Sequence, residues 1–294
     1  MAAEFEDRHW TSEDGLRLHF RDYAGPPGTS GAKAPIVCIP GLTRNARDFE
    51  DLAEKLAVRR RVLCLDLRGR GDSAYAKDPA TYNPLTYVGD LRALLDQAGI
   101  ARFVAIGTSL GGLVALLFAA GQAERLTGAV FNDVGPEVSG AGLARIGGYV
   151  GQGRSFETWM HAARALQESQ GEMFPDFAIA DWLTLAKRAM TLGSNGRIVF
   201  DYDMKISEPL ATPILPSADA APPDLWPCWR ALAGRPVLVL RGALSVILAP
   251  EIAARMIAEL PDAVLVTLPR IGHAPTLDEP ETVAAIERLL DRAE

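Results

Sequence analysis

The sequence predicts an α/β protein in which helices cover both faces of a mostly parallel central sheet. Short apolar runs alternate with longer helical segments, which is typical of β-α-β units. A segment of alternating polar and apolar residues precedes them and predicts an antiparallel hairpin, and one long helical stretch interrupts the alternation. The chain of 294 residues is long enough for one large domain that carries an insert.

The N-terminal hairpin is predicted from "HWTSEDGLRLHFRDY", in which apolar and polar residues alternate on both sides of Asp14-Gly15. Asp-Gly is a common pair in tight turns between antiparallel strands. We therefore expect this hairpin at one edge of the sheet.

Six further strands are expected to lie inside the sheet, because each is nearly all apolar and so suits a strand covered on both faces. They comprise residues 36–39, 62–67, 103–107, 129–132, 237–241 and 263–268. The helical segments between and after them comprise residues 48–57, 87–98, 110–121, 249–260 and 280–291.

The alternation fails between about Gly135 and Ala211, where amphipathic helical stretches and Gly-rich joints replace it and no strand is convincing. A helical insert between two strands of one sheet explains this pattern. We expect residues 1–134 to form the first part of the core, 135–211 a helical cap, and 212–294 the second part of the core. A Pro-rich piece, residues 211–227, returns the chain to the core.

Composition excludes several classes of function. The net charge is −7 with acidic residues spread along the chain, which argues against a nucleic-acid partner. No apolar run reaches membrane-spanning length, and "MAAEFEDRHW" lacks the apolar stretch of a secretory signal. The three cysteines provide no disulfide framework or zinc-binding spacing. We expect a cytoplasmic protein without a membrane, metal or cofactor partner.

The pentapeptide Gly107-Thr108-Ser109-Leu110-Gly111 is the strongest chemical signal in the chain. A buried strand precedes it and an apolar helix follows at once, so the serine is expected on a tight strand-to-helix turn. Glycines at 107 and 111 avoid clashes that a Cβ would create there. The turn exposes Ser109 above the sheet beside a helix N-terminus, whose free N–H groups suit an oxyanion.

A serine nucleophile needs a base within hydrogen-bond reach, and His273 is the best candidate. It follows the last strand, on a loop at the same sheet edge as Ser109, because parallel strands deliver their following loops to one side. The other histidines, His9, His19 and His161, lie in the hairpin or the insert and are expected to be surface or packing residues.

Together these features resemble the α/β-hydrolase superfamily, and the resemblance covers essentially the whole chain. It includes the hairpin, "PGLTRN" after the first central strand, "LDLRGRGDS" after the second, the serine turn, the insert as a cap, and a late histidine loop. The resemblance implies a serine hydrolase with backbone N–H groups of Leu42 and Leu110 as oxyanion donors. This chain has Pro40 where many members have histidine. The change is expected to be tolerated, because the oxyanion donors are backbone groups further along the loop.

The resemblance also implies an acid after the strand at 237–241, and there this chain has Val246, which cannot accept a hydrogen bond from His273. Three explanations compete. Asp133, after the strand that follows the serine turn, supplies the acid, as in some members such as fungal zearalenone-lactone hydrolases; alternatively Asp133 only caps its turn. Ser245 accepts the imidazole proton and gives a weaker triad. Or the protein is catalytically impaired.

Other polar and aromatic residues have weaker signals. Asp66, Arg68 and Asp72 are typical of a rigid, hydrogen-bonded turn below the site, and Asp278 and Glu279 of the start of the final helix. Arg44 and Asn45 either bind a polar substrate group or lie in a solvated loop. The insert aromatics Trp159 and Trp182 either line a substrate pocket or pack in a core.

The sequence therefore predicts a capped hydrolase that cleaves a carboxylic ester or lactone through an acyl-enzyme on Ser109. His273 is the expected base and Asp133 the residue that orients it. Two alternatives stay open: a carbon–carbon bond hydrolase of meta-cleavage type, and a hydrolase-like protein that binds a ligand without turning it over, which Val246 favours.

Overall fold

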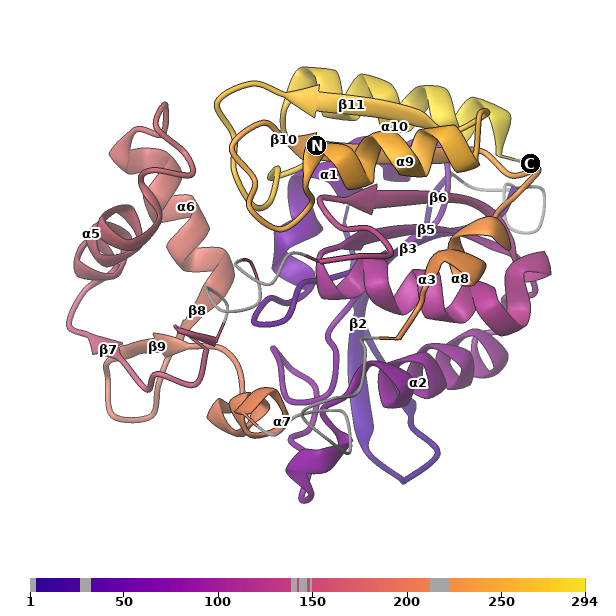
Figure 1. The fold of residues 1–294 in the computed structure, drawn as a ribbon. Coiled ribbons are helices and arrows are strands. Elements are labelled where there is room, and N and C mark those ends of the chain that lie inside the picture. The colour runs from indigo at the N-terminus through magenta and orange to yellow at the C-terminus, as the bar shows by residue number, and fades with distance from the viewer. Residues whose placement is uncertain are drawn as a thin grey trace.

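The computed structural model describes residues 4–26, 33–138, 142, 147, 148, 150–211 and 223–293. Its main sheet has eight strands in the order β1-β2-β4-β3-β5-β6-β10-β11 (Figure 1). The strands are β1 Glu6–Thr11, β2 Arg17–Tyr23, β3 Ile36–Ile39, β4 Val62–Leu65, β5 Phe103–Thr108, β6 Leu126–Asn132, β10 Val237–Gly242 and β11 Val264–Leu268.

The sheet is parallel except at its N-terminal edge. The hairpin strand β2 pairs antiparallel with β1 and with β4, and every neighbouring pair from β4 to β11 is parallel. The predicted fold class is confirmed. The edge strand β11 differs from the expectation for a doubly covered strand, because only Leu268 in it is buried.

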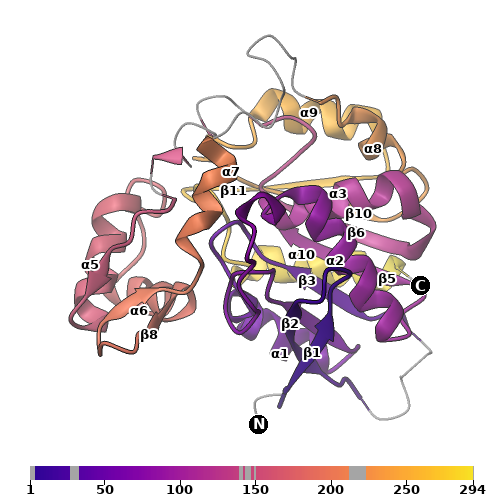
Figure 2. The ribbon, with the colours of Figure 1, turned by 90° about the horizontal axis from the view of Figure 1, so that it is seen from below.

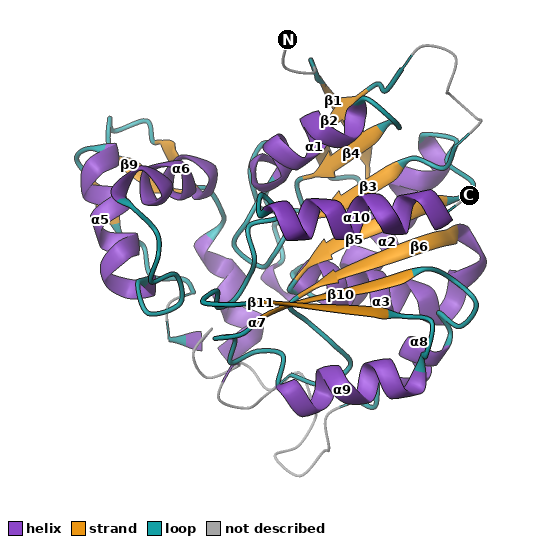
Figure 3. Cartoon of the chain, turned by 90° about the horizontal axis from the view of Figure 1, so that it is seen from above, coloured by secondary structure: helices purple, strands orange, loops and turns teal. Residues whose placement is uncertain are grey.

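Helices cover both faces of this sheet (Figure 3). One apolar core contains side chains of α2 (Pro84–Gln97), α3 (Leu110–Gln122), α8 (Trp226–Arg230) and α9 (Pro250–Glu259). A second core, on the opposite face, contains α1 (Glu50–Ala57) and α10 (Pro280–Arg292). The carboxyl ends of the central strands stay uncovered by these helices, and the loops that follow the strands gather there.

The insert between β6 and β10 lies to one side of the sheet, and the arrowheads of β6 and β11 point toward it (Figures 1 and 2). Its helices α5 (Trp159–Gln170) and α6 (Ile179–Ala189) share a separate apolar core. The helix α7 (Glu208–Ala211) follows. Residues 212–222 of the Pro-rich return piece lie outside the described residues.

The expectation that this insert has no strand is wrong. Three short strands, β7 (Ser155–Phe156), β8 (Met190–Leu192) and β9 (Ile198–Phe200), form a small antiparallel sheet in the order β7-β9-β8. Strands of two or three residues are too short to show a period of two. The available signal was Asn195-Gly196 in the β8–β9 turn, where Gly196 has φ +76°.

The segment 201–203, for which the sequence suggested no role, attaches the insert to the core. Gly71 N donates to Asp201 O at 3.1 Å and Asp203 N donates to Gly69 O at 2.8 Å, a strand-like bridge. The hydroxyl of Tyr82 donates to the Asp203 carboxylate at 2.7 Å. The exit from the insert is therefore bonded to the turn that follows β4.

The same turn is fixed from the other side by His19. Its Nδ1 lies 2.7 Å from Asp66 Oδ2 and its Nε2 lies 2.9 Å from Asp7 Oδ1, with the ring only 1% exposed. Burial lowers the pKa of His19, but the hydrogen bonds of Asp66 and Asp7 and the charges of Asp66 and Asp72 outweigh burial and raise the pKa above the ordinary value. His19 is thus a buried, ion-paired residue, whereas His9 and His161 are exposed.

Among the described residues, every helix is too short or too polar to cross a lipid bilayer.

The His19 ion pairs predict a pH-dependent contribution to stability. A folded-state pKa above the unfolded value of 6.5 means that the contribution is complete below about pH 6.5 and is lost as pH rises through the folded-state pKa. The Tm deficit of His19→Gln relative to the wild-type protein should therefore be larger at pH 6 than at pH 9 by thermal unfolding. His9→Gln serves as the exposed control, and a deficit that does not change with pH would contradict the assignment.

Candidate active site

Ser109 stands on the tight turn between β5 and α3. Its φ of 51° and ψ of −116° lie outside the ordinary regions, a strain that persists only where the surroundings enforce it. A Cβ at Gly107 would lie 2.4 Å from Gly112 N, and one at Gly111 would lie 2.0 Å from Ile39 O. Both glycines are therefore required for α3 to start directly against β3 and β5.

His273 lies beside this serine. Its Nε2 is 2.9 Å from Ser109 Oγ, although the two residues are 164 positions apart in the chain. Both residues are partly exposed, so the pair is not sealed inside the apolar core. The parallel sheet explains the contact, because β5 and β11 end at the same edge.

Asp133, the first residue after β6, lies on the other side of the imidazole. Its Oδ2 is 2.7 Å from His273 Nδ1, and the residue is 0% exposed. Its φ of 57° is a left-handed conformation that a short polar residue tolerates better than most. The Asp133 carboxylate therefore lies where an acceptor for the imidazole is needed. Val246, which cannot serve as that acceptor, is 41% exposed.

Ser245 does not contact the imidazole as the second explanation required. Its Oγ lies 2.5 Å from Asp133 Oδ2 and so donates to the carboxylate. The N–H of Gly242 donates to the other oxygen, Oδ1, at 3.1 Å. These distances favour the first of the three explanations, with Ser245 as a partner of Asp133.

Asn132, which the sequence analysis did not single out, ties the serine turn to the histidine loop. Its carbonyl accepts from Ser109 N at 3.0 Å. Its side-chain Nδ2 donates to Pro275 O at 2.9 Å and to Thr108 Oγ1 at 3.1 Å. The available signal was its position beside Asp133 at the end of β6.

The loop after β3 lies against the serine on the side where the oxyanion donors are expected. A Cβ at Gly41 would be 3.9 Å from Ser109 Cβ. Leu42, the next residue, has its carbonyl fixed by Arg70 Nε at 2.9 Å. Leu110 is the first residue of α3, where the backbone N–H has no partner within the helix.

The three proposed substrate-binding residues lie in different surroundings. Arg44 is half-buried on the loop beside Gly41, and both Nε and a terminal nitrogen of its guanidinium bind Asp48, at 2.7 and 2.5 Å. Trp182 is 1% exposed, inside the core of the insert, where it contacts Phe174 and Phe177. Trp159 packs against the same core and is half-buried. Such burial favours the packing interpretation for Trp182.

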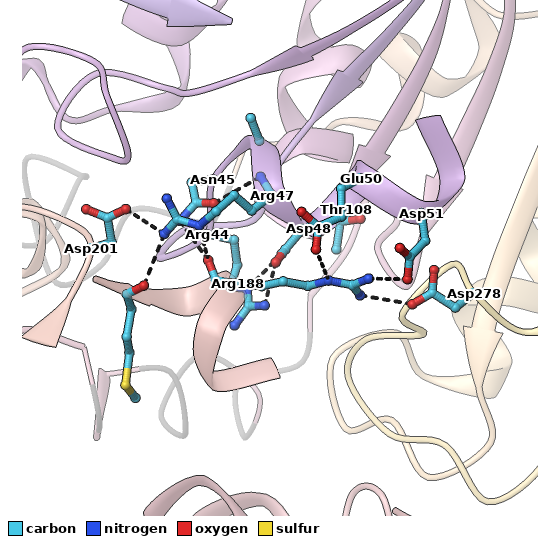
Figure 4. A network of polar contacts seen from close by, with 12 residues as sticks. Arg44, Asn45, Arg47, Asp48, Glu50, Asp51, Thr108, Arg188, Asp201 and Asp278 are labelled. Carbon is cyan, nitrogen blue, oxygen red and sulfur yellow. Dashed lines mark hydrogen bonds and ion pairs between the residues drawn. The ribbon is translucent and has the colours of Figure 1, made fainter. Parts of the chain in front are cut away.

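Arg188, at the end of α6, connects the insert to both sides of the site (Figure 4). Its guanidinium binds Asp278 at 2.9 Å, on the loop that carries His273, and Asp51 at 2.5 Å, at the start of α1. Its carbonyl accepts from Asn45 Nδ2 at 3.0 Å, on the loop that carries Leu42. The sequence assigned Asp278 to the final helix; in the structure its carboxylate pairs with a residue of the insert.

One cluster among the described residues has the composition of a metal site. Ligand atoms of His19, Asp66 and Asp72 lie within 4.8 Å of one another. Both imidazole nitrogens, however, are bonded to carboxylates, and Asp66 already accepts from Ala46 N at 2.7 Å and Asp72 N at 3.0 Å. These bonds engage both imidazole nitrogens of His19 and both carboxylate oxygens of Asp66 in holding the turn.

A family model described as the alpha/beta hydrolase family matches residues 36–286, a range that includes Ser109, Asp133 and His273. The chain belongs to the alpha/beta hydrolase family. A crystal structure of an alpha/beta hydrolase from Novosphingobium aromaticivorans is 64% identical, with a TM-score of 0.92 and 99% of each chain covered.

Curated members of the family are also similar. The 3-hydroxybutyrate-oligomer hydrolase of Cupriavidus necator is 32% identical over 255 residues, which is 85% of each chain. The mouse sn-1-specific diacylglycerol lipase ABHD11 is 26% identical, over 84% of this chain and 77% of the lipase. A structure of E-2-(acetamidomethylene)succinate hydrolase shares the fold at 21% identity, with a TM-score of 0.79.

The Arg188 contacts predict that loss of its ion pairs lowers the free energy of unfolding more than loss of an exposed ion pair of the insert. Arg188→Gln leaves Asp278 and Asp51 without their cation, so the free energy of unfolding should fall by about 2 kcal/mol in urea titrations. Asp176→Asn removes the exposed pair between Asp176 and Arg270, which also joins the insert to the core, and should change little. Equal losses in both variants would contradict a special role for Arg188.

Proposed function

We propose that this alpha/beta hydrolase is a serine hydrolase that cleaves a carboxylic ester or lactone through an acyl-enzyme intermediate. The observation that carries the proposal is the hydrogen-bonded series from Ser109 Oγ to His273 Nε2, at 2.9 Å, and from His273 Nδ1 to Asp133 Oδ2, at 2.7 Å. Nucleophile, base and orienting acid in this arrangement recur on unrelated folds that perform acyl transfer.

In the first half-reaction, His273 Nε2 removes the Ser109 proton while Oγ attacks the carbonyl carbon of the ester. The C–O π electrons move to the carbonyl oxygen and give a tetrahedral oxyanion. The oxyanion collapses, the bond to the alkoxy group breaks, and His273 returns the proton to the departing alcohol. An acyl group then remains on Ser109.

Water completes the cycle by the same steps. Water attacks the acyl carbon while His273 takes a proton from it. His273 then returns that proton to Ser109 Oγ when the acid is released. No cofactor or metal is needed for either half-reaction. The N–H groups of Leu42 and Leu110 are the proposed donors to both oxyanions, since Leu110 begins α3 and Leu42 follows the glycine beside Ser109.

Asp133 is proposed to hold His273 with its proton on Nδ1 and to stabilise the imidazolium formed in each step. Val246 favoured a ligand-binding protein without activity, because valine cannot accept a hydrogen bond from His273. The proposed role of Asp133 removes that argument, since Asp133 supplies the acceptor from another position. Residues 135–211 are proposed to act as a cap that shapes the acyl or alcohol site, with 1–134 and 212–294 as the hydrolase core.

For the substrate class we propose short oligoesters of hydroxy acids as the first to test. The Cupriavidus relative is named for 3-hydroxybutyrate oligomers, whose units are joined by carboxylic ester bonds, and the likeness spans 85% of both chains. Diacylglycerol, in the name of the mouse relative, is also a carboxylic ester.

The proposal predicts hydrolysis of short-chain p-nitrophenyl esters that depends on Ser109. Ser109→Ala should lose at least about a thousandfold in kcat/KM, because no other group in the site replaces the nucleophile. Release of p-nitrophenolate is the readout, followed by acid release from 3-hydroxybutyrate oligomers. Equal rates for the wild-type protein and Ser109→Ala would end the hydrolase proposal, whereas activity on the p-nitrophenyl ester alone would remove only the oligoester class.

Asp133→Asn tests the acid. The amide keeps the shape but has no negative charge to stabilise the imidazolium and can turn a donor NH2 toward Nδ1, so turnover should fall at least about a hundredfold. A change within twofold in steady-state kcat would remove Asp133 from the triad. Val246→Asp is the comparison, and a strong gain in kcat from it would instead identify the valine as the cause of a catalytic defect.

A further inference from the structure

Asp133 Oδ2 lies within hydrogen-bond distance of two donors. The imidazole Nδ1 of His273 lies 2.7 Å from this oxygen, and Ser245 Oγ lies 2.5 Å from the same atom. Because an ionised carboxylate only accepts, the Ser245 hydroxyl must donate to it. Both contacts are therefore charge-assisted, the stronger class of hydrogen bond.

The orientation of the Ser245 hydroxyl is fixed by its own surroundings. Ser245 is 8% exposed, and its Oγ accepts from Ile247 N at 3.1 Å and Leu248 N at 3.4 Å. With backbone N–H groups directed at its lone pairs, the hydroxyl hydrogen is left for Asp133. The loop after β10 thus has a hydrogen-bond donor in the place where the resemblance to α/β-hydrolases implied an acid.

We propose that Ser245 is a positioning residue of the active site, which acts on the base only through Asp133. The inference rests on the proposed serine-hydrolase function. Ser245 fixes the carboxylate so that Oδ2 faces Nδ1, and it withdraws part of the negative charge that would otherwise stabilise the protonated imidazole. Gly242 N–H, on the other oxygen, completes the set of donors.

This role gives the serine beside Val246 a function in the loop after β10. The Asp133 carboxylate is 0% exposed, and a buried carboxylate needs donors to replace the water that it loses. Asp133 directly follows β6 and Ser245 follows β10, the neighbouring strand. Ser245, beside Val246, is therefore close enough to donate to the Asp133 carboxylate.

The test compares Ser245→Ala, Ser245→Thr and Val246→Ala with the wild-type protein in the p-nitrophenyl ester assay. Ser245→Ala should lower kcat by about tenfold, because the carboxylate is no longer held with Oδ2 facing Nδ1 and the base is misplaced, with little change in KM. The acidic limb of its kcat/KM profile should move to higher pH, because the freed carboxylate stabilises the protonated base. Ser245→Thr keeps the hydroxyl and should restore most of both values.

Val246→Ala is the matched control, since it alters the next side chain of the same loop at an exposed position. It should retain the kcat and pH profile of the wild-type protein. A loop that serves only folding would instead lower Tm in Ser245→Ala, without a shift of the pH profile and without rescue by threonine. That result would overturn the positioning role.

A double-mutant cycle with Asp133→Asn gives a second readout. If Ser245 acts through Asp133, Ser245→Ala should have little further effect on the rate of Ser109 acylation in the Asp133→Asn background. Full additivity would overturn the inference. Failure of the inference stays distinct from failure of the proposed function, because the latter requires equal rates for the wild-type protein and Ser109→Ala.

Discussion

The buried carboxylate of Asp133 is the group on which the geometry of the site depends. It is 0% exposed and accepts hydrogen bonds from His273, Ser245 and Gly242, which belong to two different loops and the end of β10. Burying an ion is costly unless donors replace its water, and here each donor also anchors a segment of the site. The requirement to satisfy one charge thus sets the relative positions of the histidine loop and the loop after β10.

A second set of charges connects the insert to this rim. Arg188 binds Asp278 on the histidine loop and Asp51 on α1, while its carbonyl binds Asn45 on the loop of Leu42 (Figure 4). Arg47 bonds the same carbonyl of Arg188 at 3.2 Å and pairs at 2.6 Å with Asp201, directly after β9. These contacts therefore join the insert to the loop of Leu42 and to the loop of His273, the two loops that flank Ser109 in the proposed site.

The sequence predicted the parts of this arrangement that local rules determine. Apolar runs gave the parallel strands, and the two glycines around Ser109 marked a turn whose steric demands leave little choice of residue. It also predicted that Ser109 and His273 meet, since that follows from the common edge of a parallel sheet. It left the acid open among Asp133, Ser245 and no residue, because side-chain direction at the end of a strand depends on packing between strands that are distant in sequence.

Two other features were beyond local rules for a similar reason. The small sheet of the insert consists of strands too short to show periodicity, and Arg188 on α6 has no neighbour in sequence that reveals its partners on three other segments. Long-range ion pairs and side-chain hydrogen bonds leave no periodic trace. The residues that form them can be identified only from the folded structure.

The place of the acid also follows from sheet geometry. β6 and β10 are adjacent parallel strands, with Asn132 and Leu240 in register, and neighbouring strands lie only about 4.8 Å apart. An imidazole above their ends is within reach of a short carboxylate on either strand. What fixes the choice is the set of donors: the Gly242 N–H and the Ser245 hydroxyl both point from β10 and its loop toward β6. Val246 is then compatible with the proposed triad, because β10 and the loop after it supply two of the hydrogen bonds that the Asp133 carboxylate requires.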